Sequence, residues 1–91
     1  MAKKWESPKD PNEVLDYSVN WSGLLAGDTI ATSTWTVPVG VTGGAMAFTD
    51  TETLIWLSGG TEGESYDLLN RITTAAGRTR DQTCTLKIKT K

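Results

Sequence analysis

The side chains that could do chemistry in this 91-residue chain are mostly carboxylates, because it contains no histidine and one cysteine. Without histidine, the usual Ser-His-Asp and Cys-His arrangements for nucleophilic catalysis cannot form. Zinc sites need several Cys or His ligands, which one cysteine cannot supply. The missing residue types therefore exclude the commonest hydrolytic and zinc-dependent chemistries.

The carboxylates leave calcium binding and glycoside hydrolysis to be considered. Calcium needs about six to eight oxygen ligands converging from a loop, but Asp10, Asp16, Asp28 and Asp50 are scattered and no D-x-D-x-D-G pattern occurs. A glycosidase needs two carboxyl groups facing each other across a cleft, and nothing in the spacing indicates one. We therefore expect no enzyme, no catalytic, metal-binding or cofactor-binding residues, and no cofactor.

The elements that must position the side chains are strands, and the clearest are the last two. One strand carries residues that recur at period two and so share a face: Tyr66, Leu68, Asn70 and Ile72. Gly77 is placed for the positive-φ position of a short hairpin loop. The return strand alternates in the same way, with an inward set of Cys84, Leu86 and Ile88. Cys84 is expected there as a small hydrophobic residue rather than a reactive thiol.

Two aromatic residues indicate the kind of sandwich to which this hairpin belongs. Tyr66 follows a glycine-rich corner and precedes an inward apolar residue by two positions, as in the tyrosine corner of immunoglobulin-like domains. Trp35, within Thr29–Val37, has the position of their core tryptophan on the third strand. We predict an all-β fold, an immunoglobulin-like antiparallel β-sandwich of about seven strands with Greek-key connections. Its predicted core comprises Tyr17, Val19, Trp21, Trp35, Tyr66, Leu68, Asn70, Ile72, Cys84, Leu86 and Ile88.

The remaining segments are less regular. Val14–Trp21 alternates cleanly and predicts a strand, and Ser22–Asp28 is a connection whose Leu24 and Leu25 are expected to plug one end of the core. Val39–Ala47 contains three glycines and is predicted to be a loop with at most a short strand. Thr51–Ser58 predicts a strand with two apolar faces. Asn70, polar on the core face, is expected to be hydrogen-bonded to the backbone of a neighbouring loop.

The length allows one domain, which we place at residues 11–91 after an extended arm at residues 1–10. The chain has no apolar run near the ~18 residues of a transmembrane helix and no charged-then-apolar opening typical of a signal peptide. Residence in the cytoplasm is therefore the default prediction.

Charge is unevenly distributed along the chain. Residues 1–67 hold ten acidic and three basic residues, a balance of −7, whereas residues 68–91 hold one acidic and six basic residues, a balance of +5. The isoelectric point of 4.9 and the lack of any exposed aromatic residue beyond Tyr66 in the basic hairpin argue against a nucleic-acid partner. Solvated charge at a strand edge is the favoured interpretation, and contact between the acidic body of one copy and the basic hairpin of another is the alternative.

Five residues are candidates for a contact surface. Trp5 lies in the polar arm, where it either folds back onto the sandwich or anchors a partner. Trp56 lies on one of the two apolar faces of its strand and is the preferred candidate for an exposed aromatic residue. The basic hairpin contributes the other three: Arg71, Arg78 and Arg80.

The chain resembles a family of small phage and prophage virion-associated proteins with an immunoglobulin-like fold. The residues that carry the resemblance span nearly all of the chain beyond residue 9. They are Lys9–Tyr17, Asn20–Ser22, Leu25–Ile30, Ser33–Pro38, Ile55–Thr61, Gly63, Tyr66, Leu68 and Asn70–Arg78.

The resemblance implies a non-enzymatic structural or accessory role in the virion, as a capsid decoration or a module at the neck or tail. The implied partners are other virion proteins, with self-association as an addition and no nucleic acid or membrane. The implied location is the host cytoplasm during assembly and then the virion. The main alternative is a carbohydrate-binding module for a host-surface glycan, with Trp56 or Trp21 stacking on sugar. An intracellular regulator of host proteins is a third, weaker hypothesis.

Overall fold

The structure is a computed structural model that describes residues 2–4 and 9–90. This part of the chain forms seven strands and one short helix, α1 (Ser22–Leu25), which follows β2. The strands are β1 (Ala2–Lys4), β2 (Leu15–Asn20), β3 (Ile30–Thr36), β4 (Val41–Phe48), β5 (Glu52–Gly59), β6 (Ser65–Thr74) and β7 (Thr79–Lys87).

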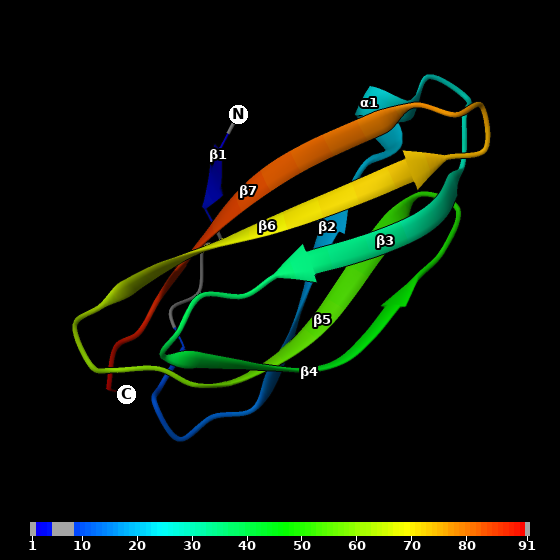
Figure 1. The fold of residues 1–91 in the computed structure, drawn as a ribbon. Helices are drawn as coiled ribbons and strands as arrows, with labels where there is room; N and C mark the ends of the chain where they lie inside the picture. Colours follow the sequence, from blue (N-terminus) through cyan, green and yellow to red (C-terminus); the bar gives the residue numbers. More distant parts are fainter. Residues whose placement is uncertain (1, 5–8, 91) are drawn as a thin grey trace.

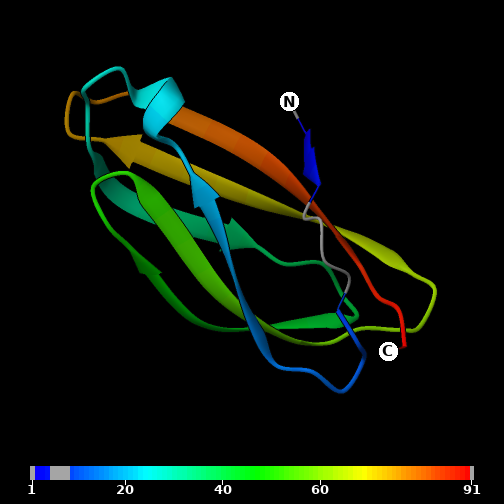
Figure 2. The same ribbon diagram turned by 180° about the vertical axis from the view of Figure 1, so that it is seen from behind.

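The strands make two facing sheets, one in the order β1-β7-β6-β3 and the other in the order β2-β5-β4 (Figure 1). Neighbouring strands are antiparallel, except that β1 pairs in parallel with β7. Figure 2 shows from behind that α1 and the β6–β7 turn lie at one end, with the β5–β6 turn at the other. The predicted all-β sandwich is confirmed.

The core lies between the sheets and consists of inward side chains at period two along the strands. In β6, for example, Leu68 and Ile72 are fully buried. The turn from β6 to β7 contains Gly77, whose φ of 89° agrees with the predicted positive-φ position. Of the predicted core residues, nine are buried: Tyr17, Val19, Trp21, Leu68, Asn70, Ile72, Cys84, Leu86 and Ile88. Trp35 and Tyr66 are partly buried and pack against this cluster.

The prediction of a loop at Val39–Ala47 is wrong, because β4 occupies Val41–Phe48 and pairs with β5 along both of its halves. Its glycines lie at an irregularity in the pairing between Gly43 and Met46. Glycine inside a strand often marks such a bulge or a close approach of other atoms. A Cβ on Gly43 would come within 3.1 Å of Val37 Cγ2, so the absence of a side chain at Gly43 allows Val37 to approach the strand closely.

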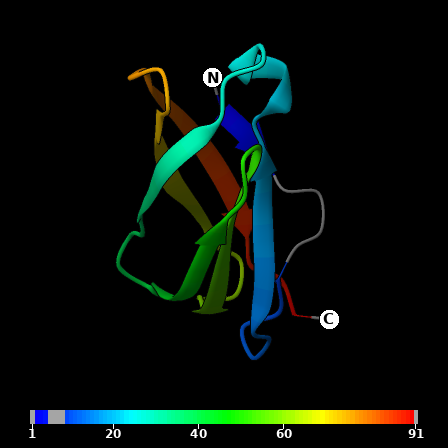
Figure 3. The same ribbon diagram turned by 90° about the vertical axis from the view of Figure 1, so that its right-hand side faces the viewer.

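One end of the sandwich is closed by α1, which Figure 3 shows at the same end as the β6–β7 turn. Leu25 is buried in the core, as expected, but Leu24 is half exposed, so the prediction that both leucines plug the core is wrong for Leu24. In a single helical turn adjacent residues point in different directions, and only one of two neighbouring leucines can face the core.

Asn70 is a hydrogen-bonding centre that connects the two sheets. Its Oδ1 accepts hydrogen bonds from Trp21 Nε1 at 3.0 Å and from Thr53 Oγ1 at 2.5 Å. Its Nδ2 donates to Ser33 Oγ at 3.0 Å and to the Thr34 carbonyl at 2.9 Å. The partners are therefore side chains and a strand carbonyl, not the backbone of a loop as the sequence analysis expected.

Tyr66 forms a hydrogen bond back across the glycine-rich corner, as the tyrosine of a tyrosine corner does. Its hydroxyl accepts the backbone N–H of Thr61 at 3.1 Å. Gly40 lies close to the same ring, since a Cβ there would lie 2.8 Å from Tyr66 Cε1. The corner between β5 and β6 is thus held to the loop between β3 and β4.

Two described parts of the predicted N-terminal arm lie against the sandwich. Ala2–Lys4 forms β1, and Lys9 is completely buried and bridged in parallel to Ile88. The Lys9 ammonium donates to the carbonyls of Asp10 at 2.8 Å and Gly59 at 2.6 Å. Burial lowers the pKa of Lys9, an effect that the nearby carboxylates of Glu13 and Asp10 partly offset.

Asp28 connects the segment before β3 to the β6–β7 turn. Its carboxylate accepts the backbone N–H groups of Thr29 at 2.8 Å and Ala76 at 3.2 Å, and it pairs with Arg78 at 3.1 Å. A hydrogen bond from the Thr74 hydroxyl, followed by these other donors, holds the pKa of Asp28 below its ordinary value of 3.8.

We expect this carboxylate to contribute stability that depends on pH. Because the pKa is lower in the folded state, the contribution is complete above pH 3.8 and is lost as the pH falls through the lowered value. Asp28→Asn should therefore lower the melting temperature at pH 6 and flatten its fall between pH 5 and pH 2. Thermal unfolding at several pH values, compared with the wild type, checks this. An unchanged slope would contradict it.

Candidate contact surfaces

The outer face of the β2-β5-β4 sheet presents a short apolar row to solvent. Ile55 and Leu57 of β5 point into the core, so Leu54 and Trp56 point outward. Trp56 remains 39% exposed, in keeping with its selection as an exposed aromatic residue. Gly44 of β4 lies beside it, since a Cβ there would come within 3.4 Å of the Trp56 carbonyl oxygen. Small residues next to Trp56 leave the indole accessible.

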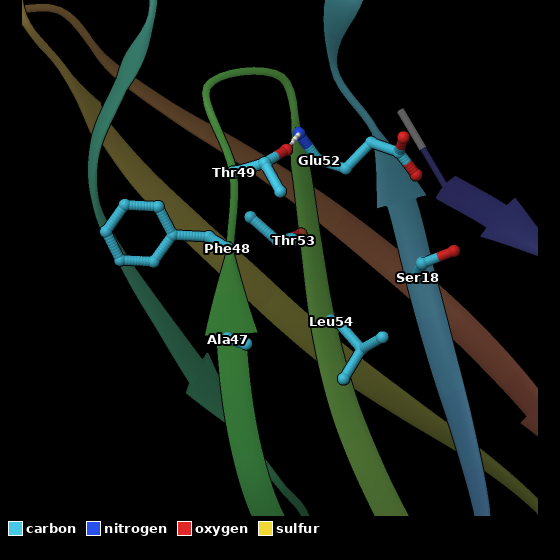
Figure 4. A pocket seen from close by; sticks show the side chains of 7 residues that line it. All are labelled: Ser18, Ala47, Phe48, Thr49, Glu52, Thr53 and Leu54. Carbon is cyan, nitrogen blue, oxygen red and sulfur yellow. Dashed lines mark hydrogen bonds between the residues drawn. The ribbon is translucent and has the colours of Figure 1, made fainter.

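A shallow hollow of about 200 Å³ continues this row toward the β4–β5 turn. Figure 4 shows Ser18, Leu54 and Ala47 side by side on the outer face, one from each strand of the sheet, with Phe48 pointing away from them. The turn beyond is fixed by a hydrogen bond from the Glu52 backbone N–H to Thr49 Oγ1 at 3.1 Å. The surface of the hollow is mainly apolar.

The charged groups around this face are acidic. Asp16 is paired across the strands with Trp56, and Glu52 lies on the same face. Residues 10–67 contain nine Asp or Glu residues and no Lys or Arg. The outer face of β2-β5-β4 is therefore an apolar row with an acidic surround, which favours a partner that carries positive charge.

The basic hairpin differs from what its sequence indicates, because two of its arginines are paired. Arg71 makes a bidentate ion pair with Asp81 across β6 and β7, in which Nε donates to Oδ1 at 2.7 Å and Nη2 donates to Oδ2 at 2.9 Å. Arg78 pairs with Asp28 at 3.1 Å. Arg80 is exposed and forms no ion pair with another described residue. The Arg71–Asp81 pair is exposed on both sides and contributes little to stability, whereas the Asp28 side chain of the other pair is largely buried. Both pairs reduce the positive charge that the hairpin offers to a partner.

The other aromatic candidates are placed differently. Trp21 is 1% exposed and its Nε1 is bonded to Asn70, so burial removes it as a residue that could stack on a sugar. Trp5 lies outside the described residues.

Among residues 2–4 and 9–90, no group of three or more Cys, Asp or Glu side chains could hold a metal ion. No helix in that same part of the chain is long and apolar enough to cross a membrane.

Two exposed apolar residues were missed by the sequence analysis. Met46 and Phe48 of β4 are 50% and 45% exposed. The prediction of a loop at Val39–Ala47 concealed them, because a residue's face cannot be assigned without a strand. The alternation of Met46, Ala47 and Phe48 just before a turn was the available signal.

The described residues form a small β-sandwich with apolar side chains exposed on β4 and β5. Comparison with family models finds a match over residues 9–87 to the family described as podophage GP4 fiber-tail adaptor protein gp77. The match covers most of the chain, which therefore belongs to this family of phage virion proteins. The predicted resemblance to a small virion-associated family is confirmed. No curated protein sequence matches the chain.

Proposed function

We propose that this protein is a non-enzymatic adaptor that connects a fibre to the tail of a podophage through protein–protein contacts. The family's description as a fiber-tail adaptor supports this role and favours the tail over decoration of the capsid. The structural observation that carries the proposal is the position of the exposed apolar side chains. Every exposed large apolar side chain within a described strand lies on β4 or β5: Met46, Phe48 and Trp56.

Trp56 lies on the outer face of the sheet, whereas Met46 and Phe48 lie on its interior side, at the edge strand β4. Exposed apolar side chains on two neighbouring strands favour a protein contact, because exposed apolar surface on small soluble domains commonly marks interaction sites. Trp56 has the properties of an interface anchor, since tryptophan is enriched among the residues that dominate binding. Its position on the central strand of the sheet, with Asp16 opposite, places an apolar centre beside a polar margin.

The strand order supports the predicted immunoglobulin-like arrangement, which we also propose. The sheets of an immunoglobulin constant domain contain strands A-B-E-D and C-F-G. The orders β2-β5-β4 and β3-β6-β7 correspond to B-E-D and C-F-G when the strands are named in chain order from β2. Tyr66 and Trp35 occupy the matching places at the start of β6 and on β3.

Trp56→Ala should leave the sandwich folded and weaken its attachment to particles. The indole is partly exposed on the outer face, so its loss removes contact area rather than core packing. The measurement is the amount of this protein and of fibre per purified particle, by quantitative mass spectrometry, with immunogold electron microscopy to locate the protein. We expect at least about a tenfold fall, consistent with the loss of an anchor residue.

Val39→Ala is the control for this variant, because Val39 is almost fully exposed in the loop between β3 and β4. It should assemble as the wild type does. Trp56→Ala particles with normal amounts of both proteins would count against a contact at Trp56. Gold particles on the capsid rather than the tail would overturn the adaptor role.

A glycan remains a second candidate ligand for the same face, because Trp56 has a carboxylate partner, Asp16, directly across the strands. An aromatic side chain beside a carboxylate can stack on a sugar ring and accept its hydroxyls. Titration with host polysaccharide while tryptophan fluorescence is recorded separates the two. A saturable change that Trp56→Ala abolishes would favour the glycan.

A further inference from the structure

The free edge of β4 is a second surface with unusual properties. Among the described residues β4 pairs only with β5, so its other edge carries unpaired backbone groups. Proteins normally protect such edges with charged residues, proline or very short strands. β4 has eight residues and contains no charged residue and no proline. β2, the other edge of the same sheet, carries Asp16.

The direction of the backbone groups follows from the turn that joins β4 to β5. The Thr49 N–H donates to the Glu52 carbonyl at 2.8 Å, so the Thr49–Glu52 pair is hydrogen-bonded. Bonded and non-bonded pairs alternate along an antiparallel ladder. Phe48 and Met46 are therefore in non-bonded pairs, with Thr53 and Ile55, and their N–H and C=O groups point toward the free edge.

The side chains of the same two residues are also incompletely covered. Thr53 and Ile55 are fully buried, and residues directly opposite on paired strands share a face. Met46 and Phe48 thus face the interior side of the sheet, yet about half of each remains exposed, because no strand lies beyond β4. Backbone groups and apolar side chains of the same residues are available together.

We propose that the edge of β4 at Met46–Phe48 binds an extended segment of a partner protein, which pairs with it as an additional strand. Main-chain hydrogen bonds supply affinity in this mode of recognition, and alternate side chains supply specificity. The segment carries apolar residues two apart that cover Met46 and Phe48. It carries lysine or arginine near Asp50 and Glu52, at the end of the hairpin. The proposal deepens the adaptor role proposed above and takes its partner, the fibre or the tail, from it.

Charge complementarity supports a basic partner segment rather than a second copy of this chain. Asp50 and Glu52 are exposed and form no ion pair with another described residue. A second copy that paired β4 with β4 would bring no basic residue, since neither β4 nor β5 contains one. Two such sheets would bring together acidic surfaces of the same sign, which opposes association.

The test uses the full-length protein with two probes, the purified tail fibre of the parent phage and fibreless tails. The variant M46K/F48K places positive charge on the proposed edge, and T32K/T34K makes the same charge change on β3, which is one of the two edge strands of the other sheet. We expect M46K/F48K to weaken binding to one probe by at least about 30-fold, as for loss of an anchor residue. T32K/T34K should change it less than about threefold, as for residues outside the anchors.

Phe48→Pro and Phe48→Ala separate the backbone contribution from that of the side chain. Proline removes the N–H that points to the free edge and leaves the ladder with β5 intact. Its binding should therefore be weaker than that of Phe48→Ala, and the Met46 and Phe48 amides of the wild type should exchange more slowly in the complex. Circular dichroism and thermal unfolding confirm that each variant is folded.

Three outcomes would overturn the proposal. If M46K/F48K binds both probes as the wild type does, the edge is not the site, while the adaptor role stands. If M46K/F48K loses only self-association in sedimentation experiments, the occupant is a second copy. If the wild type binds neither probe, the adaptor role fails, and this inference fails with it because it takes its partner from that role.

Discussion

Asn70→Ala is expected to lower the free energy of unfolding by about 4 kcal/mol, a large share of the roughly 5–15 kcal/mol available to a domain. The amide makes four hydrogen bonds that join β6 to β3, to β5 and to Trp21. Alanine removes the acceptor of the buried Thr53 hydroxyl and the shorter of the two acceptors of the Trp21 N–H, which keeps only Thr53 Oγ1 at 3.3 Å. It also removes a donor from the part-buried Thr34 carbonyl. Each unsatisfied buried group costs about 1–3 kcal/mol, and the smaller side chain adds a cavity.

Urea denaturation at pH 7 measures this effect, with Asn12→Ala as the control, since the Asn12 side chain lies outside the core. Asn70→Asp tests the direction of the hydrogen bonds, because it keeps the acceptor for Trp21 but loses the donor to Thr34. It should be at least as destabilising as alanine, since a buried carboxylate would face a carbonyl oxygen. A loss below about 1 kcal/mol for Asn70→Ala would show that water replaces the amide.

The sandwich could be predicted from the sequence because its largest strands are half buried and alternate cleanly. Tyr66, Leu68 and Ile72 lie on one face of β6 at period two, and their side chains are buried or half-buried. The tyrosine corner could also be predicted, because it depends on Tyr66 and a local glycine-rich turn rather than on distant contacts.

β4 could not be predicted, because its formation depends on tertiary pairing rather than on local preference. Glycine is unfavourable in strands, and local preference alone predicts a turn at Gly43–Gly44. The pairing with β5 on both sides of the irregularity overrides that preference. The consequence for the candidate site is direct, since the exposure of Met46 and Phe48 follows only from the strand and its place at the edge.

The distribution of charge on the candidate contact surfaces could be predicted only in part from the sequence. The excess of acidic residues before residue 68 correctly indicated an acidic body. The pairing of Arg71 with Asp81 requires the β6–β7 register, and that of Arg78 with Asp28 requires two distant turns to meet. Burial of Lys9 likewise depends on contact with Gly59, fifty residues away in sequence.

Taken together, the surfaces divide the sandwich into two unlike sides. The β2-β5-β4 sheet carries the exposed Trp56, the free edge of β4, and Asp16 and Glu52, which form no ion pair with another described residue. On the outer face of the other sheet, the Arg71–Asp81 ion pair and the Thr85–Asp67 hydrogen bond satisfy polar groups internally. We therefore expect the variants that alter binding to cluster on β4 and β5.

Gly60→Ala is expected to lower the free energy of unfolding by about 3 kcal/mol, for two separate physical reasons. Gly60 has a φ of 102°, which costs any L-residue about 1–2 kcal/mol. An added Cβ would also lie 2.6 Å from Ile88 Cδ1 and 2.7 Å from Ile88 Cγ1, and Ile88 is buried next to the Lys9 bridge. Forcing extra atoms into a packed core typically costs about 1–3 kcal/mol.

Gly63→Ala is the matched control, because Gly63 has a φ of 83° in the same turn but no atom within 4 Å of an added Cβ. It should cost only the backbone term, about 1 kcal/mol. The two losses, measured by urea denaturation, differ by the steric contribution of Ile88. Ile88→Val removes the Cδ1 atom, so the double variant with Gly60→Ala should lose less than the sum of the single variants. Equal losses for Gly60→Ala and Gly63→Ala would mean that Ile88 moves aside without cost.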